Sequence, residues 1–231
     1  IESGEKIKAR AILIASGAEY RRLALDNLEK FEGRGIYYSA TKADAAFCEG
    51  ECVAIVGGGN SAGQAAVFLS STAEKIYIMI RGSSLSLTMS NYLIDRIEDA
   101  GNIEVLTNSE ITKITGEDHT ESIEVRDNVT QSKSTLNVKA IFSFIGAIPN
   151  TQWLPAEIER DEKGFIKTGT SAANSPQWML SRPPFLLETS RPGVFAAGDV
   201  RSMSSKRVAA AAGEGSMTVQ FVHEYLKSVL V

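Results

Sequence analysis

Short apolar runs that end in glycine or polar residues recur along this chain. Residues 8–16, 51–56 and 76–80 each form such a run, and each has the length of a buried β-strand. A helical pattern over residues 64–69 lies between the second and third runs and follows a glycine-rich turn. Strand, glycine turn, helix and strand in this order predict a βαβ unit with right-handed, parallel packing.

Downstream of this unit the pattern favours a change of sheet type. A helix is expected at residues 91–100, and alternating stretches follow at residues 103–114 and 122–127. Alternation of apolar and polar residues is typical of antiparallel strands with one solvated face. We expect the apolar run at residues 138–145 to close that antiparallel sheet.

The last third of the chain contains a hairpin signal, a strand and a long helix. Residues 161–164 have the composition of a tight turn, and residues 193–197 predict a buried strand. A final amphipathic helix is expected over residues 209–230. The pattern as a whole predicts an α/β fold.

Composition narrows the class of protein without identifying an activity. The chain has 231 residues, of which 43% are hydrophobic and 23% charged, and a net charge of −4, as in ordinary globular proteins of one or two domains. The basic residues are scattered, so we expect no nucleic-acid partner. The apolar runs are far shorter than the roughly 20 residues that a membrane-spanning helix needs, so we expect no membrane association.

Cysteine and histidine usage is sparse. Cys48 and Cys52 are the two cysteines, which favours a reducing compartment, and we expect a cytoplasmic protein in which both are small, buried structural residues. His119 and His223 have no metal-ligand spacing to these cysteines, so we expect no metal site. The sequence begins at Ile1 without a secretory pattern, and we expect it to be cut from a longer chain.

A dinucleotide fingerprint follows the second predicted strand. Gly57, Gly59 and Ala62 have the GxGxxA spacing, and Asn60 and Ser61 begin the helix. The first glycine permits a tight turn, the second leaves room for the pyrophosphate, and the small third residue lets helix and strand pack. Free N–H groups at the helix start favour phosphates. The alternative is a glycine turn with only a structural role.

Residues at two strand ends indicate which cofactors bind. Arg81, Ser83 and Ser84 follow the third strand, where an NAD-binding domain has an acidic residue; a cation and hydroxyl groups suit the 2′-phosphate of NADPH, although Arg81 could be only a solvated strand-end charge. Gly198 and Asp199 follow a later strand and fit a flavin site in which Asp199 binds a ribityl hydroxyl. Gly-Asp is also a common turn.

Several motifs occur in a distinctive order. They are ASGA at residues 15–18, GRGIYYSAT at 33–41, VAIVGGGNSAGQAA at 53–66, FIGAIPN at 144–150, GVFAAGDV at 193–200 and KRVAAAAGEG at 206–215. Over essentially the whole chain, this order resembles the low-molecular-weight thioredoxin reductases, within the pyridine nucleotide-disulfide oxidoreductase superfamily. The resemblance implies two Rossmann-like three-layer dinucleotide-binding domains: an NADPH domain at residues 34–146, inserted into an FAD domain split between residues 1–33 and 147–231.

The resemblance also implies which residues contact the cofactors. NADPH would be held by Gly57, Gly59, Asn60, Ser61, Ala62, Arg81, Ser83 and Gly146. FAD would be held by Ser16, Gly17, Gly198, Asp199, Arg207, Val208 and Ala209, with Val208 a departure from the family's Arg-Gln-Ala.

Three further departures from the family affect the expected chemistry. The family's redox pair Cys-Ala-Thr-Cys falls on Ser39, Ala40, Thr41 and Lys42, so we expect no catalytic residue there. The family's arginine-rich 2′-phosphate site is reduced to residues 80–82, with Ser86 in the place of a later arginine. The first FAD fingerprint is not in this sequence, and we expect roughly 100 residues of the FAD domain to be missing.

These departures predict an FAD-dependent NADPH oxidoreductase that passes electrons to an acceptor other than the usual active-site disulfide. Ferredoxin NADP reductases of the thioredoxin reductase type also lack this cysteine pair and also pass electrons to another acceptor. The acceptor would be a small redox protein or a small molecule, the full-length protein a homodimer, and this chain alone inactive. Two alternatives stay open: a thioredoxin-disulfide reductase whose redox cysteines lie elsewhere, and a non-enzymatic NADPH-responsive regulatory module.

Overall fold

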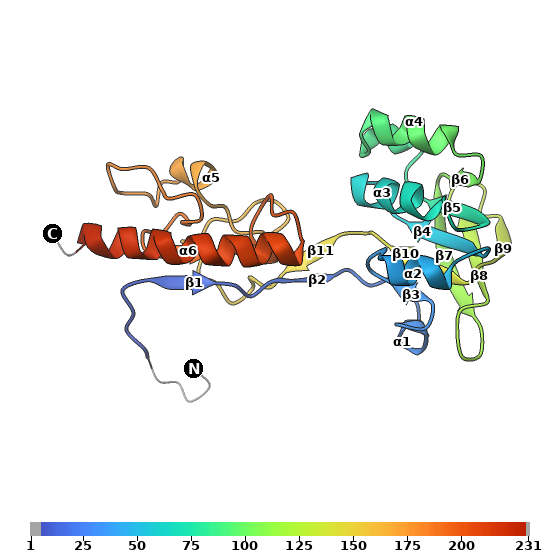
Figure 1. Ribbon diagram of the computed structural model, residues 1–231, viewed down its shortest axis with the longest axis horizontal. Helices are drawn as coiled ribbons and strands as arrows, with labels where there is room; N and C mark the ends of the chain where they lie inside the picture. The colour runs from blue at the N-terminus through green and yellow to red at the C-terminus, as the bar shows by residue number, and fades with distance from the viewer. Residues whose placement is uncertain (1–5, 230–231) are drawn as a thin grey trace. The chain divides into compact units, whose positions relative to one another are not determined.

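The computed structural model describes residues 6–229, which divide into two compact units (Figure 1). The inserted unit comprises residues 20–146, and the split unit comprises the described residues 6–19 together with residues 147–229. Helices and strands alternate around parallel strands in both units, which confirms the predicted α/β class. None of the helices in the described part of the chain has the length and apolarity to cross a bilayer.

A five-stranded parallel sheet forms the centre of the inserted unit. Its strand order is β3-β10-β4-β5-β6. The strands are β3 (Ile36–Tyr37), β4 (Cys52–Val56), β5 (Lys75–Met79), β6 (Ile103–Leu106) and β10 (Ala140–Ser143). Successive residues of β4 point to opposite faces of the sheet. Val53 and Ile55 therefore belong to one hydrophobic core and Ala54 to another.

Different layers cover the two faces of this sheet. Three helices and a short 3₁₀ segment contribute to the first core: α2 (Lys42–Phe47), α3 (Asn60–Leu69), α4 (Asn91–Asp99) and η1 (Leu85–Leu87). The second core lies beneath an antiparallel sheet of β7 (Ser109–Thr115), β8 (Ser122–Asp127) and β9 (Lys133–Asn137). The inserted unit is therefore a three-layer sandwich, as a Rossmann-like domain requires.

The structure corrects two strand assignments. The stretch 103–114 is not one antiparallel strand: Asn108, with φ of +50°, separates β6, which pairs in parallel with β5, from β7. The run 138–145 does not close the antiparallel sheet, because β10 lies between β3 and β4 in the parallel sheet. Its near-continuous apolar sequence reflects burial on both faces, which central parallel strands share.

A short helix, α1 (Leu28–Phe31), belongs to the inserted unit. Leu28 and Phe31 are 4% and 1% exposed and pack in the second core with Ile36 and Ile114. The compact unit thus begins at residue 20, before the boundary expected at residue 34.

Short strands and one long helix make up the split unit. β1 (Ile12–Ile14) pairs in parallel with β12 (Val194–Ala196), and β2 (Ala18–Tyr20) pairs with β11 (Ala147–Pro149). The other elements are α5 (Thr170–Ala173), η2 (Gly198–Val200) and α6 (Val208–Val229). The expected final helix is confirmed as α6, except that Leu230 lies outside the described residues.

The predicted tight turn at residues 161–164 is present. The Asp161 amide donates a hydrogen bond to the Phe165 carbonyl at 2.8 Å, and the Gly164 amide donates to the Asp161 carbonyl at 2.9 Å. Arg160 and Ile166 form an antiparallel bridge across this turn.

Candidate functional site

A glycine turn joins β4 to α3 at the carboxyl end of the parallel sheet. Gly57 has φ of +139°, which L side chains rarely adopt, and a Cβ added there would lie 2.6 Å from the Phe144 carbonyl oxygen. Gly59 has an extended backbone, and a Cβ there would meet open space. The fold therefore requires glycine at position 57, whereas Gly59 keeps the approach to the helix open.

The start of α3 offers unpaired donors. Gly59 is its N-cap residue and provides no side-chain hydrogen bond to the first turn. By contrast, α2 is closed by a capping box in which the Thr41 hydroxyl accepts from the Asp44 amide and the Asp44 carboxylate accepts from the Thr41 amide. An uncapped helix start presents N–H groups and a partial positive charge, which fit a phosphate.

Ala62 and Gly63 bring α3 close to its neighbours. Ala62 is fully buried in the first core. A Cβ on Gly63 would lie 2.8 Å from the Met89 sulfur, so α3 and the start of α4 also approach closely. Ser61 is exposed, in keeping with a position beside the open helix start.

Arg81 and Ser83 lie at the same edge of the sheet as the glycine turn. β4 and β5 pair in parallel with Val56 opposite Met79, so the chain leaves both strands at one edge. Arg81, Ser83 and Ser84 are all exposed. The Ser84 hydroxyl accepts a hydrogen bond from the Ser86 amide at 3.2 Å and lies 2.8 Å from the Ser86 hydroxyl oxygen.

Two hydrogen bonds tie this serine-rich loop to the glycine turn. The Thr88 hydroxyl donates to the Gly58 carbonyl at 2.7 Å, and the Ser90 amide donates to the Asn60 side-chain oxygen at 2.8 Å. We call this pair of contacts the loop latch. Sequence reasoning identified Asn60 but missed Thr88 and Ser90, because nothing in the local pattern marks a contact across thirty residues.

Gly146 follows β10, the other neighbour of β4, and thus lies at this edge too. Its φ is +100°, and a Cβ there would meet open space. The structure therefore brings all the residues predicted to hold NADPH to one end of the sheet, on adjacent strand ends and the start of α3.

Residues 39–42 hold no thiol. Thr41 is the N-cap of α2, and Lys42 is its first residue, so the place of the family's redox pair is occupied by a helix start. Cys48 and Cys52 are free cysteines. Burial, followed by the charges of Asp44 and Glu51, raises the pKa of Cys48 to about 11, and burial also raises the pKa of Cys52. Both groups remain thiols at neutral pH, and a thiol is a poor nucleophile.

The residues predicted to hold FAD lie in the split unit. Ile14 pairs with Ala196 in the parallel pair β1 and β12, so Ser16 and Gly198 follow the two strands at the same edge. The Ser16 hydroxyl donates to the Asn150 carbonyl at 2.8 Å, and the Asn150 side-chain amide donates to the Ser16 carbonyl at 3.0 Å. Gly17 and Gly198 have φ of +69° and +77°.

Helix α6 begins close to the Gly198 turn. The Gly198 amide donates to the Glu214 carboxylate at 2.7 Å, and Arg201 forms an ion pair with that carboxylate. Asp199 is half-buried in η2. The remaining predicted contacts, Arg207, Val208 and Ala209, are exposed at the first turn of α6. Sequence reasoning missed Glu214 as the residue that connects α6 to this turn.

No cluster of three or more metal-ligating side chains occurs within residues 6–229. His119 follows β7 in the inserted unit, and His223 is on α6 in the split unit.

Comparison with known proteins gives consistent matches. The family model described as pyridine nucleotide-disulphide oxidoreductase matches residues 2–215. A protein from Staphylococcus aureus that is named as a component of alkyl hydroperoxide reductase is 30% identical over 226 residues, which cover 98% of this chain and 41% of that protein. The 34.2 kDa protein in the rubredoxin operon of Clostridium pasteurianum is 32% identical over 95% of this chain and 65% of its own length.

Solved structures match as well. Thioredoxin reductase from Giardia duodenalis has a TM-score of 0.75 and 28% identity, over 94% of this chain and 66% of that one. The Lactococcus lactis thioredoxin reductase in its FR conformation has a TM-score of 0.71 and 26% identity over the same shares. The chain thus spans 41% of the S. aureus protein and 66% of each thioredoxin reductase.

Proposed function

Because the chain belongs to the pyridine nucleotide-disulphide oxidoreductase family, we propose that it contributes the NADPH site and part of the FAD site of an oxidoreductase. Proteins of this family with a thioredoxin-reductase-like fold use FAD and NAD(P)H. The proposed enzyme passes electrons from NADPH through flavin to an acceptor other than a disulfide at residues 39–42.

The open start of α3 is the observation that carries the proposal. When bound, NADPH supplies a hydride and FAD accepts it and transfers the electrons onward. In this chain, Gly57 sets the turn, Gly59 leaves space above the helix start, and the first-turn amides of α3 would hold the pyrophosphate. Gly146 and Ala62 are further residues of the proposed NADPH site at this end of the parallel sheet.

A preference for NADPH is supported by the loop after β5. Arg81 is an exposed cation, and among residues 6–229 it forms no ion pair with a carboxylate. A guanidinium matches the 2′-phosphate of NADPH in both charge and geometry, and Ser83 adds a hydroxyl donor. The loop latch would hold these groups in place relative to the glycine turn.

The chemistry of residues 39–42 supports an acceptor other than a disulfide at that position. A serine hydroxyl and a lysine ammonium group can neither form a mixed disulfide nor store two electrons as a dithiol. Cys48 does not replace them, because it is fully buried and its thiol stays protonated. Ser16, Gly17, Gly198, Asp199, Arg207, Val208 and Ala209 would contact the flavin in the split unit.

The acceptor class, the quaternary structure and the compartment are also part of the proposal. We propose a small redox protein or small molecule as acceptor, a homodimer as the assembly of the full-length protein and the cytoplasm as its location. Both cysteines of this sequence are free thiols, which supports a reducing compartment.

Calorimetric titration with NADPH and with NADH tests the cofactor assignment. Arg81→Ala should weaken NADPH binding by about 1–3 kcal/mol, the range for a lost charge-assisted hydrogen bond, and leave NADH binding nearly unchanged. Lys113→Ala, which removes an exposed cation from β7, is the matched control. Equal affinities for NADPH and NADH in the unchanged protein would refute the role of Arg81, and no binding of either would refute the dinucleotide site.

Rapid-reaction spectroscopy of the FAD-loaded full-length protein tests the electron path. Addition of NADPH should bleach the flavin without a thiolate-to-flavin charge-transfer band, and NADPH-driven reduction of thioredoxin should be negligible. Fast thioredoxin turnover that is lost in a Cys48→Ser, Cys52→Ser double variant would show that these cysteines are redox-active. Fast turnover that persists in that variant would place a redox disulfide elsewhere in the protein.

A further inference from the structure

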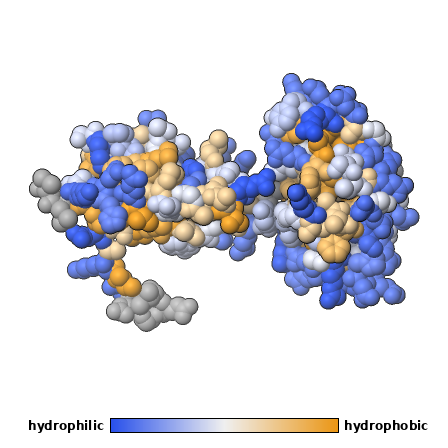
Figure 2. Space-filling model, in the orientation of Figure 1, coloured by the Kyte–Doolittle hydropathy of each residue, from blue (hydrophilic) through white to orange (hydrophobic). Residues whose placement is uncertain are grey.

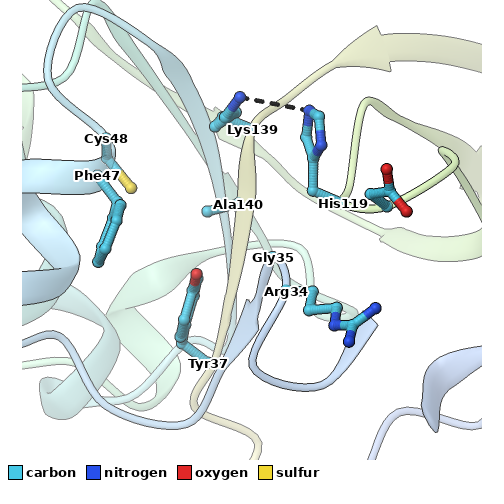
Figure 3. A pocket seen from close by; sticks show the side chains of 9 residues that line it. Arg34, Gly35, Tyr37, Phe47, Cys48, His119, Lys139 and Ala140 are labelled. Atoms are coloured by element: carbon cyan, nitrogen blue, oxygen red, sulfur yellow. Dashed lines mark hydrogen bonds between the residues drawn. The ribbon is translucent and has the colours of Figure 1, made fainter. Parts of the chain in front are cut away.

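The inserted unit contains a cavity of about 390 Å³ at the opposite end of the parallel sheet from the glycine turn (Figure 3). It lies where β3 and β10 begin and α2 ends, and the turn after β7 completes it. The glycine turn, by contrast, follows the carboxyl end of β4, which runs parallel to β10. Within the inserted unit, the cavity is thus separate from the residues assigned to NADPH.

Flat and apolar side chains form one wall of this cavity. Phe47 lines it and is 71% exposed, although it is a large hydrophobic residue. Tyr37 also lines it and stacks on Phe142 with ring centroids 5.5 Å apart, which holds its ring in place. Cys48 contributes a thiol that burial keeps protonated. This wall suits a flat, uncharged surface such as an aromatic ring.

Basic side chains lie around the same cavity. Arg34 and Lys139 are basic residues of the lining, and the Lys139 Nζ atom lies 3.3 Å from the His119 Nε2 atom (Figure 3). No ion pair joins Arg34, His119 or Lys139 to a carboxylate within the described residues 6–229. Asp118 is the one carboxylate in the lining, which also contains the two basic side chains Arg34 and Lys139.

We propose that this cavity binds a small aromatic carboxylate, with its ring against Phe47 and Tyr37 and its carboxylate at the Lys139 ammonium group. The volume lies within the range of small-molecule sites, roughly 300–1,000 Å³. An ammonium group donates charge-assisted hydrogen bonds to a carboxylate, and Arg34 adds a second basic side chain to the lining. The proposed function neither uses nor explains this site, so the inference goes beyond it.

Naphthoate is the probe that tests the site, and naphthamide is its uncharged counterpart of the same shape. Isothermal titration of the whole chain should show naphthoate binding at least about fivefold more tightly than naphthamide, because only the acid can form charge-assisted hydrogen bonds. Saturating NADPH should not displace it. Equal affinity for both compounds, no binding at millimolar concentration, or displacement by NADPH would each overturn the proposal.

Charge variants locate the contacts. Lys139→Gln should weaken naphthoate by about fivefold or more and leave naphthamide unchanged, whereas Lys139→Arg should retain binding. Lys113→Gln, at an exposed position of β7 outside the cavity lining, removes the same charge and should change nothing. Phe47→Ala should weaken both compounds, since it removes the apolar wall. An effect of Lys139→Gln no larger than that of Lys113→Gln would overturn the proposal, and thermal unfolding of each variant checks its folding.

Discussion

The inserted and split units bury their side chains in different ways. The inserted unit has a hydrophobic core on each face of a five-stranded sheet. The split unit has two two-stranded sheets and one small core, and Thr218 is the buried residue of its 22-residue helix α6. Figure 2 shows hydrophobic residues at the surface of the split unit, where Ile12, Leu13, Val208 and Val219 are 43% exposed or more. A long helix therefore does not by itself create a core.

Polar contacts replace part of the missing apolar burial in the split unit. Glu188 is completely buried and accepts hydrogen bonds from both Arg182 guanidinium ends, at 2.7 and 3.0 Å, and from the Phe185 and Gly193 amides. Glu214 similarly binds Arg201 and the Gly198 amide. Among the described residues, apolar burial on both faces of a sheet stabilises the inserted unit, whereas the split unit combines one small apolar core with polar networks around Glu188 and Glu214.

The largest effect is expected when the inserted unit is produced alone. A fragment of residues 20–146 should fold, because both of its cores are internal to it. A fragment of residues 34–146 should be less stable by about 4 kcal/mol or more, since it lacks buried Leu28 and Phe31. Urea unfolding followed by circular dichroism measures the difference. Equal stability of the two fragments would show that α1 contributes nothing to the second core.

Alanine substitutions at Gly57 and at Gly59 test the proposed NADPH site of the inserted unit. Gly57→Ala should cost about 3 kcal/mol of folding stability, because its φ is unfavourable for alanine and the new Cβ would clash with Phe144. Gly59→Ala should leave the free energy of unfolding unchanged but weaken NADPH at least about tenfold, because the methyl group fills the phosphate approach. Urea unfolding and calorimetry separate these outcomes. Unchanged NADPH affinity in Gly59→Ala would contradict the site.

The pH dependence of folding stability tests the contribution of Glu214 to the polar network of the split unit. Burial would raise the pKa of Glu214, but hydrogen bonds from Arg201 and the Gly198 amide outweigh it and lower this pKa. A lowered pKa stabilises the fold above the unfolded-state value, and this contribution is lost as the pH falls through the folded-state value.

We therefore expect Glu214→Gln to cost about 2 kcal/mol at pH 7, the range for hydrogen bonds to a charged group. The difference from the unchanged protein should shrink as the pH falls below about 4.3, the ordinary pKa of glutamate in an unfolded chain. Chemical unfolding at several pH values measures it. A difference that is independent of pH would mean that packing, not charge, accounts for the role of Glu214.

The smallest effect is expected at the loop latch. Thr88→Val should cost about 0.5–1 kcal/mol of stability and weaken NADPH a few fold, because the hydroxyl bond to the Gly58 carbonyl is lost at an exposed position. Thr88→Ser should retain both properties. If Thr88→Val reduces stability without changing NADPH affinity, the latch supports the fold but not the cofactor.

Local sequence patterns were sufficient to predict the glycine turn and the strand and helix on either side of it. β4, the start of α3 and the position of Arg81 follow from apolar runs and from the different roles of Gly57 and Gly59, all within thirty residues of each other. The place of β10 was not predictable in this way, because an apolar run indicates burial but not which sheet buries it. The roles of Thr88 and Glu214 depend on contacts that only the folded chain creates.

The position of β10 has a consequence for the order of assembly during synthesis. β3 precedes β4 in the sequence, yet its partner in the sheet is β10, about a hundred residues later. A ribosome releases β3, β4, β5 and β6 before β10, so β4, β5 and β6 can pair while β3 still has no neighbour. The nascent chain must keep the edge of β4 free until residues 140–143 emerge and insert between two strands already made. Such long-range closure slows folding, and it leaves the β4 edge open to wrong pairing during translation.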